Sequence, residues 1–283
     1  MPGDRRRPRI VQSLCRWGAS YLRTGNKVAF GANVSSVLVL DPKVCGSTRP
    51  VTMSTQEHCF PELRLFQITD SAFPLGSFAF SYGLESMAKL GRIKDISDFK
   101  KYLLNVLTQV SCSEIPFLNS SYKCAPGEHD VLVSVFGRLE AFITIPCIRK
   151  ASITQGRSLL QVVKAVYPEH NFHQVTNWLQ RHGLSTHYAL IFGIVSRSIG
   201  LTHRQTLSAY AYIALRDQMS AAIRLGLLGP HEAQGILREA LGQVDSNITR
   251  VLDLEYHQAF KVAVALEIAQ AHHPKLYSHL FQN

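Results

Sequence analysis

The chain has 283 residues, with 30 Lys and Arg against 20 Asp and Glu, so its formal net charge is +10. Because 46% of the residues are hydrophobic and only 18% are charged, the composition excludes a wholly disordered chain. With 18 glycines, 12 prolines and six cysteines, it also excludes collagen-like and disulfide-scaffold proteins. The unusual value is the positive net charge, which raises the question of nucleic-acid or membrane-surface binding.

The first segment, residues 1–56, carries most of this charge. It holds nine basic residues and two acidic ones, a net charge of +7, which leaves +3 for the other 227 residues. Three interpretations stay open: a disordered or non-native leader with Met53 as the true start, an organellar transit segment, or a nucleic-acid-binding arm. An arm of this kind would lose affinity steeply with salt. No groove-reading helix or interleaved aromatic residues accompany the charges, so we do not expect nucleic acid as a partner.

The rest of the chain gives no sign of a membrane span. Its longest apolar run, residues 189–195, is far shorter than the roughly 20 residues that a transmembrane helix needs. The six cysteines form no CxxC pair and no disulfide framework, which is typical of reduced thiols in an intracellular protein. We therefore expect a cytoplasmic protein, with organellar targeting by the leader as the open alternative.

From residue 61 onward, apolar residues recur with the 3.6-residue period of an α-helix. This pattern predicts helices around residues 99–110, 132–143, 159–166 and 172–179. We expect Pro146, Pro168 and Gly183 to end the last three of them.

The clearest predicted helix begins at Thr202. Thr202 and Gln205 have the spacing of a capping box, and apolar residues continue from there to Gly226. Further helices are predicted from Pro230 to Gly242 and around residues 248–256. The predicted fold class is therefore all-α, with residues 57–283 forming a single bundle-like domain after a basic N-terminal leader.

The sequence lacks the common motifs of catalysis and nucleotide binding. It contains no GxxxxGK[ST] loop, no GxGxxG after a strand, no GxSxG and no HExxH. His170 and His173 have a helical spacing, and His272, His273 and His279 are close in sequence, but two ligands seldom make a metal site. We therefore expect no catalytic residue, no metal site and no cofactor bound to this chain.

Residues 65–85 predict a helix, a turn and the start of a second helix. Pro74 should end the first helix, Gly76 permits a tight turn, and Ser81 is a candidate cap of the second helix. Two roles are open for the aromatic residues of this segment, which either pack in the core or act as anchors on a partner surface. They are Phe78, Phe80 and Tyr82.

Five motifs, in order along the chain, resemble those of UreF-type urease accessory proteins. They lie at residues 74–85, 149–160, 187–193, 221–230 and 276–281. The resemblance covers residues 65–281 and does not include the leader. One departure is His279, which stands where the family's tail has Arg and would weaken a bidentate contact with a carboxylate. The segment 122–147 is also atypical.

The resemblance implies an all-helical, usually homodimeric scaffold that is not an enzyme. Such a protein joins a UreD/UreH-type protein and a UreG-type GTPase to apo-urease and gates GTP-dependent nickel insertion. Nickel would be handled by the complex and GTP bound by the partner. Two other function classes stay open: a helical enzyme with an unrecognised pocket, and a basic nucleic-acid-binding protein that acts through the leader.

The resemblance also implies two partner-binding groups of residues. The first would face the GTPase: Ser81, Tyr82, Glu85, Arg149, Lys150 and Arg224. The alternative role for these residues is helix capping and buried ion pairing. The second group is a tail that would face the UreD-type protein: Tyr277, His279, Leu280 and Phe281. The alternative for the tail is that it folds onto the chain's own core.

Overall fold

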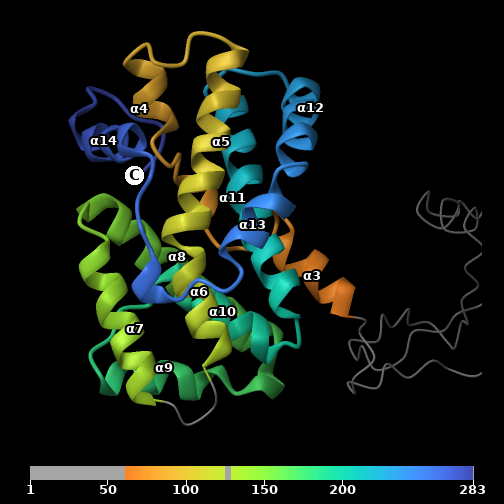
Figure 1. The fold of residues 1–283 in the computed structure, drawn as a ribbon, viewed down its shortest axis with the longest axis vertical. Helices are drawn as coiled ribbons and strands as arrows, with labels where there is room; N and C mark the ends of the chain where they lie inside the picture. The colour runs from red at the N-terminus through yellow and green to blue at the C-terminus, as the bar shows by residue number, and fades with distance from the viewer. Residues whose placement is uncertain (1–60, 125–128, 283) are drawn as a thin grey trace, which may run out of the picture. The chain divides into compact units, whose positions relative to one another are not determined.

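A computed structural model of the chain describes residues 61–124 and 129–282, and the structural statements below concern these residues. Every regular element among them is a helix, and none of them forms a strand (Figure 1). The predicted all-α fold class is therefore confirmed. Residues 1–56 and Met53, on which the predictions about a leader depend, lie outside the described residues. In the described ranges no helix is both long and apolar enough to cross a membrane.

Three long helices dominate the fold: α5 (Ile96–Ser113), α8 (Pro146–Val166) and α11 (His203–Arg224). The predicted capping box of α11 is present, because Thr202 Oγ1 accepts a hydrogen bond from Gln205 N and Gln205 Oε1 accepts one from Thr202 N. The shorter helices are α3 (Pro61–Thr69), α4 (Leu84–Lys89), α6 (Ile115–Lys123), α7 (His129–Phe142), α9 (Phe172–Arg181), α10 (Tyr188–Ser198), α12 (Pro230–Leu241), α13 (Val244–Val251) and α14 (Val264–His272).

Three predicted helix boundaries differ from the structure. Helix α3 ends at Thr69 rather than at Pro74. Helix α8 begins at Pro146 rather than near residue 159, because proline lacks an N–H group and its fixed φ suits the first turn of a helix. Helix α13 ends at Val251, and Tyr256 lies in a separate 3-10 turn. Gly183 closes α9 as predicted, with a φ of 62° that favours glycine.

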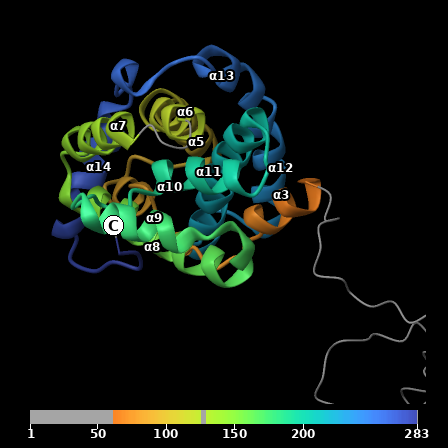
Figure 2. The same cartoon turned by 90° about the horizontal axis from the view of Figure 1, so that it is seen from below.

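Helices α10 and α11 lie in the middle of the bundle, surrounded by the other helices (Figure 2). Helix α10 packs against α6 and α8 at very short range. A Cβ atom added to Gly156 of α8 would lie 1.8 Å from the carbonyl oxygen of Thr186, and one added to Gly193 of α10 would lie 2.2 Å from Ser121 Oγ. Glycine is therefore required at both helix crossings.

The turn between α3 and α4 passes through three left-handed positions, at Gly76, Tyr82 and Gly83. Gly83 is the N-cap of α4, and Ser81 Oγ accepts a weak hydrogen bond from Glu85 N at 3.4 Å. Phe78 is 67% exposed, which disagrees with the core role for this residue. Phe80 and Tyr82 are half-buried.

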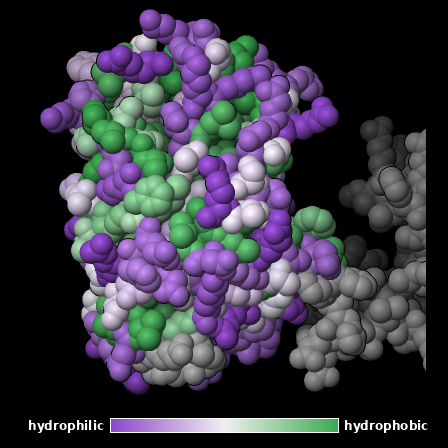
Figure 3. Space-filling model, viewed as in Figure 1, coloured by the Kyte–Doolittle hydropathy of each residue, from purple (hydrophilic) through white to green (hydrophobic). Residues whose placement is uncertain are grey.

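Helix α14 lies beside α4, and the C-terminal end of the described chain lies close to both (Figure 1). On the face shown in Figure 3, hydrophobic side chains gather over this region. Four exposed apolar residues belong to these elements: Leu90, Val264, Ile268 and Leu280. This end of the bundle therefore combines an exposed apolar surface with the C-terminal tail.

Candidate functional site

Glu85, the second residue of α4, holds the C-terminal tail. Its carboxylate is 1% exposed and accepts hydrogen bonds from the backbone amides of Leu280 at 2.7 Å and Phe281 at 3.1 Å. Lys89 Nζ lies 2.9 Å and His273 Nε2 lies 3.0 Å from the same carboxylate. Burial raises the pKa of Glu85, but the hydrogen bonds from Lys89 and the two amides outweigh it and lower the pKa. Glu85 is therefore an anionic acceptor at which the tail is fixed.

Arg224, at the end of α11, covers the other side of the tail. Its guanidinium carbon lies 4.4 Å from the centre of the Phe281 ring, and its Nη1 donates to the carbonyl oxygen of Phe78. Phe281 is 2% exposed, and the next amide, of Gln282, donates to the carbonyl oxygen of Ala79 at 2.8 Å. We use the name tail clasp for the tail's anchor, Phe281, and the three residues around it: Glu85, Arg224 and His273.

The rest of the tail faces outward. Tyr277 is fully exposed and Leu280 is 52% exposed. His279 is also exposed, with its ring centre 5.3 Å from that of His273. The four predicted tail residues therefore divide into one buried anchor, Phe281, and three side chains on the surface. The end of the tail packs on the chain's own core, while an aromatic and an aliphatic side chain stay exposed, and the assignment of the tail to a partner stays a prediction.

The six residues predicted to face a GTPase do not gather in one place. Glu85 and Arg224 belong to the tail clasp, and Ser81 is buried. The Tyr82 hydroxyl points inward and donates to Glu114 Oε1 at 2.7 Å. Five of the six make contacts within the chain, and Lys150 is exposed on α8. Their assignment to a partner surface stays a prediction.

Arg149, on α8, binds the end of α7. Its Nε lies 3.2 Å from Glu140 Oε1, and its Nη2 donates to the carbonyl oxygen of Ile143 at 2.7 Å. A positively charged side chain is well placed at these carbonyl groups, because the C-terminal end of a helix carries partial negative charge. Arg149 therefore joins α8 to α7.

Ser152, His187 and Glu140 form a network that the sequence did not reveal. Ser152 Oγ lies 3.2 Å from His187 Nδ1, and His187 Nε2 lies 2.7 Å from Glu140 Oε2. Burial lowers the pKa of His187, although the bond with Glu140 partly opposes this. Ser152 and His187 lie in two of the matched motifs, but a separation of 35 residues hides their contact.

This network has the residue types of a hydrolase triad, but its setting is structural. Ser152 is the seventh residue of α8, where backbone N–H groups are used in helix hydrogen bonds and cannot form an oxyanion hole. Its hydroxyl accepts a hydrogen bond from Tyr188 N at 3.2 Å, at the first turn of α10. Ser152 therefore caps α10 from a neighbouring helix.

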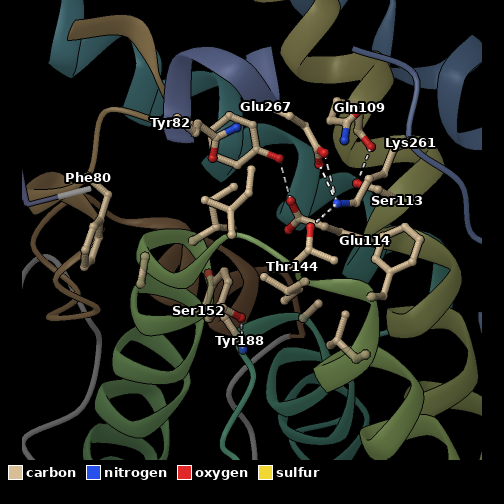
Figure 4. A pocket seen from close by; sticks show the side chains of 18 of the residues that line it. Phe80, Tyr82, Gln109, Ser113, Glu114, Thr144, Ser152, Tyr188, Lys261 and Glu267 are labelled. Carbon is tan, nitrogen blue, oxygen red and sulfur yellow. Dashed lines mark hydrogen bonds and ion pairs between the residues drawn. The ribbon is translucent and has the colours of Figure 1, made fainter. Parts of the chain in front are cut away.

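A cavity of about 120 Å³ lies inside the bundle, below Tyr82 (Figure 4). Glu114, between α5 and α6, accepts hydrogen bonds there from the hydroxyls of Tyr82 and Tyr210. Burial raises the pKa of Glu114, although the two hydroxyls partly oppose this. At one side of the cavity Lys261 and Glu267 form an ion pair with Nζ and Oε1 2.9 Å apart. In residues 61–124 and 129–282, no group of three or more His, Cys, Asp or Glu side chains could hold a metal ion.

Comparison with known proteins gives concordant matches. The sequence model of the UreF family matches residues 93–241, from just before α5 to the end of α12. Urease accessory protein F of Oryza sativa subsp. japonica is 30% identical over 220 residues, which cover 76% of this chain and 83% of the relative. Urease accessory protein UreF of Trichodesmium erythraeum is 29% identical over 224 residues, which cover 78% of this chain and 97% of the relative. Urease accessory protein F of Arabidopsis thaliana is 28% identical over 235 residues, which cover 82% of this chain and 97% of the relative.

Proposed function

This chain belongs to the UreF family of urease accessory proteins, and from that membership we propose that it is a non-catalytic scaffold for urease maturation. It joins a UreD/UreH-type protein and a UreG-type GTPase to apo-urease, and it gates GTP-dependent nickel insertion. Nickel is handled by the complex, and GTP is bound by the GTPase. The protein acts in the cytoplasm as a homodimer.

The tail clasp is the observation that carries this proposal. Binding an otherwise free segment costs conformational entropy, and holding it in its bound shape beforehand removes part of that cost. Glu85 and Phe281 fix the end of the tail, while Tyr277 and Leu280 stay exposed beside the apolar surface of α14. An exposed aromatic side chain on a fixed backbone is a suitable anchor for a protein partner. We assign this surface to the UreD-type protein.

The six GTPase-facing candidates then act in three ways. Ser81, Glu85 and Arg224 support the turn and the tail, and they influence a partner through the position of these segments. Arg149 and Lys150 offer positive charge at the start of α8, where acidic groups of a GTPase can meet them directly. Tyr82 contributes through its contact with Glu114 rather than through the surface.

Deletion of residues 274–283 tests the assignment of the tail. We expect the truncated chain to lose co-purification with the UreD-type protein while its helical circular dichroism persists, because these residues follow α14. As a matched control, replacing the exposed Phe66 of α3 by Ala should leave co-purification unchanged. Unchanged co-purification of the truncated chain would refute the assignment.

Complementation tests the maturation role itself. A strain that lacks its own UreF should regain urease activity in nickel-supplied medium when it expresses this chain, and the 274–283 deletion should not restore it. If the full chain restores activity and the deletion does so equally well, the scaffold role holds but the tail is not its partner surface. If the purified chain binds neither the UreD-type protein nor the GTPase, the scaffold role itself is wrong.

A further inference from the structure

The cavity below Tyr82 continues into a second cavity of about 70 Å³. The two share six lining residues: Phe80, Tyr82, Glu114, Gln155, Tyr188 and Tyr210. An apolar cavity of about 150 Å³ can bind benzene, so the 120 Å³ cavity has room for a molecule of about five or six non-hydrogen atoms. Thr144 is exposed and also lines the larger cavity, which places an entrance at the loop after α7.

Tyr188, the first residue of α10, places an unpaired hydroxyl group in this region. The hydroxyl is buried and has no hydrogen-bond partner among the described residues. Its ring is fixed by stacking on Tyr210, with ring centres 5.4 Å apart, and by an edge contact with Phe192 at 5.6 Å. Burial raises the pKa of Tyr188 far above the physiological range, so the group is a permanent donor. A buried donor without an acceptor is costly, and an acceptor in the cavity would satisfy it.

The cationic side chains beside the two cavities are paired with carboxylates. Lys261 is paired with Glu267, and its ammonium also lies 5.3 Å from the centre of the Phe142 ring. Burial raises the pKa of Glu114, although its hydrogen bonds with Tyr82 and Tyr210 partly oppose this. Asp217, which lines the smaller cavity, is likewise paired with Arg216 at 2.7 Å, and an uncharged ligand avoids the cost of burying charge.

One wall of the cavity is apolar. It consists of side chains from the end of α7, the following loop and the start of α8: Phe142, Ile143, Ile145 and Ile148. Water could bond to the Tyr188 hydroxyl but would gain nothing from this wall. A ligand with an apolar body would displace such weakly held water and gain affinity.

We propose that this cavity binds a small uncharged molecule that carries a hydrogen-bond acceptor on an apolar body, such as a ketone or an amide of about six non-hydrogen atoms. The Tyr188 hydroxyl donates to the acceptor, and the isoleucine wall covers the apolar body. This ligand site adds to the scaffold role and does not depend on it.

Cyclopentanone is a suitable probe, because it has six non-hydrogen atoms, one acceptor and no charge. We expect its titration into the full-length protein to shift the NMR methyl signals of Ile143, Ile145 and Ile148 saturably. Cyclobutanecarboxylate, which is of similar size but charged, should not shift them. The absence of a saturable shift with cyclopentanone would overturn the proposal.

Two substitutions locate the probe. Tyr188→Phe keeps the ring and its stacking, and loss of one neutral hydrogen bond should weaken binding about threefold to tenfold. Ala151→Leu adds volume to the cavity wall and should abolish binding while leaving the Tyr188 hydroxyl in place. Tyr212→Phe on α11 is the matched control and should change nothing. Equal binding by Tyr188→Phe and the unmodified protein would refute the role of the hydroxyl, and a crystal of the probe complex with only water on Tyr188 would refute the site.

Discussion

Glu85 Oε2 accepts a hydrogen bond from the backbone amide of Phe281, across 196 positions of the chain. This contact brings the first of the five sequence motifs onto the last, and Arg224 from the fourth motif closes over the Phe281 ring. Three motifs that look unrelated in the sequence thus share one structural role, which is to hold the tail. Their residue types suit that role, because a carboxylate accepts hydrogen bonds from backbone amides and a guanidinium packs on an aromatic face.

Replacing Glu85 by Gln should release the tail. The amide has the shape of the carboxylate but lacks its charge, and its nitrogen cannot accept hydrogen bonds from the tail amides. We expect the free energy of unfolding to fall by about 1.5–3 kcal/mol, as is typical of hydrogen bonds to charged groups. Hydrogen exchange at the amides of Leu280 and Phe281 should accelerate, and affinity for the UreD-type protein should fall.

The control for this substitution is Glu239→Gln on α12. Glu239 also pairs with a lysine, Lys100, but both side chains are exposed. Such a pair contributes about 0–1 kcal/mol, so stability and tail exchange should stay nearly the same. Unchanged exchange at positions 280 and 281 in Glu85→Gln would show that the tail is held by its other contacts.

Replacing Ser152 by Ala separates a structural from a catalytic role for the Ser152–His187–Glu140 network. The change leaves Tyr188 N and His187 Nδ1 without their partner, and we expect a loss of about 1–3 kcal/mol in the free energy of unfolding. Chemical denaturation measures this loss. Hydrolysis of nitrophenyl esters should be the same with and without Ser152, and a rate that disappears in the variant would instead identify Ser152 as a nucleophile.

Much of the fold could be predicted, because helix periodicity and capping are local. The capping box of Thr202 and Gln205 is an example, since both residues lie in one turn. The role of Ser152 could not be predicted in this way, because its partner His187 reaches it only through the packing of α8 against α10. The start of α8 at Pro146 could not be predicted for a related reason, since proline can end one helix or begin the next, and only the chain's path decides which.

The candidate site could also be predicted only in part. Resemblance selected Glu85, Arg224 and Phe281, but the sequence did not indicate that they contact one another. The cavity residues Glu114 and Tyr188 belong to no predicted site, because burial of a polar group has no signal in a single sequence. Tyr188 directly follows His187, which opens a matched motif, and this was the one available hint.

Replacing Gly156 by Ala should strongly destabilise the bundle. The added Cβ would lie 1.8 Å from the backbone oxygen of Thr186, and a backbone atom cannot move aside as a flexible side chain can. We expect a loss of about 1–3 kcal/mol or more in the free energy of unfolding. Gly235→Ala on α12 is the matched control, because no atom lies within 4 Å of its Cβ and Ala is the better helix former. That variant should gain about 0.5–1 kcal/mol, and equal effects at the two sites would contradict the close packing of α8.

Acid should weaken the folded state through its buried histidines. Burial lowers the pKa of His187 and His273 below the ordinary 6.5, although the carboxylates of Glu140 and Glu85 partly oppose this. Between pH 6.5 and the lower pKa of the folded state, the unfolded chain binds more protons. Each of these histidines therefore makes the free energy of unfolding fall as the pH falls through this range.

Buried acidic side chains have the opposite effect on the free energy of unfolding as the pH falls. Burial raises the pKa of Glu114 and Asp217, so the folded chain takes up protons first and gains stability as the pH falls.

The contribution of the histidines to stability is therefore best measured as a difference between variants. His273→Gln removes the titrating ring but can still donate an N–H to Glu85, and we expect it to lose less stability than the unmodified protein between pH 6.5 and pH 5. Denaturation curves at a series of pH values measure this, with exposed His231→Gln as control. If the free energy of unfolding changes with pH in the same way for His273→Gln and for the control, protonation of His273 does not weaken the tail clasp.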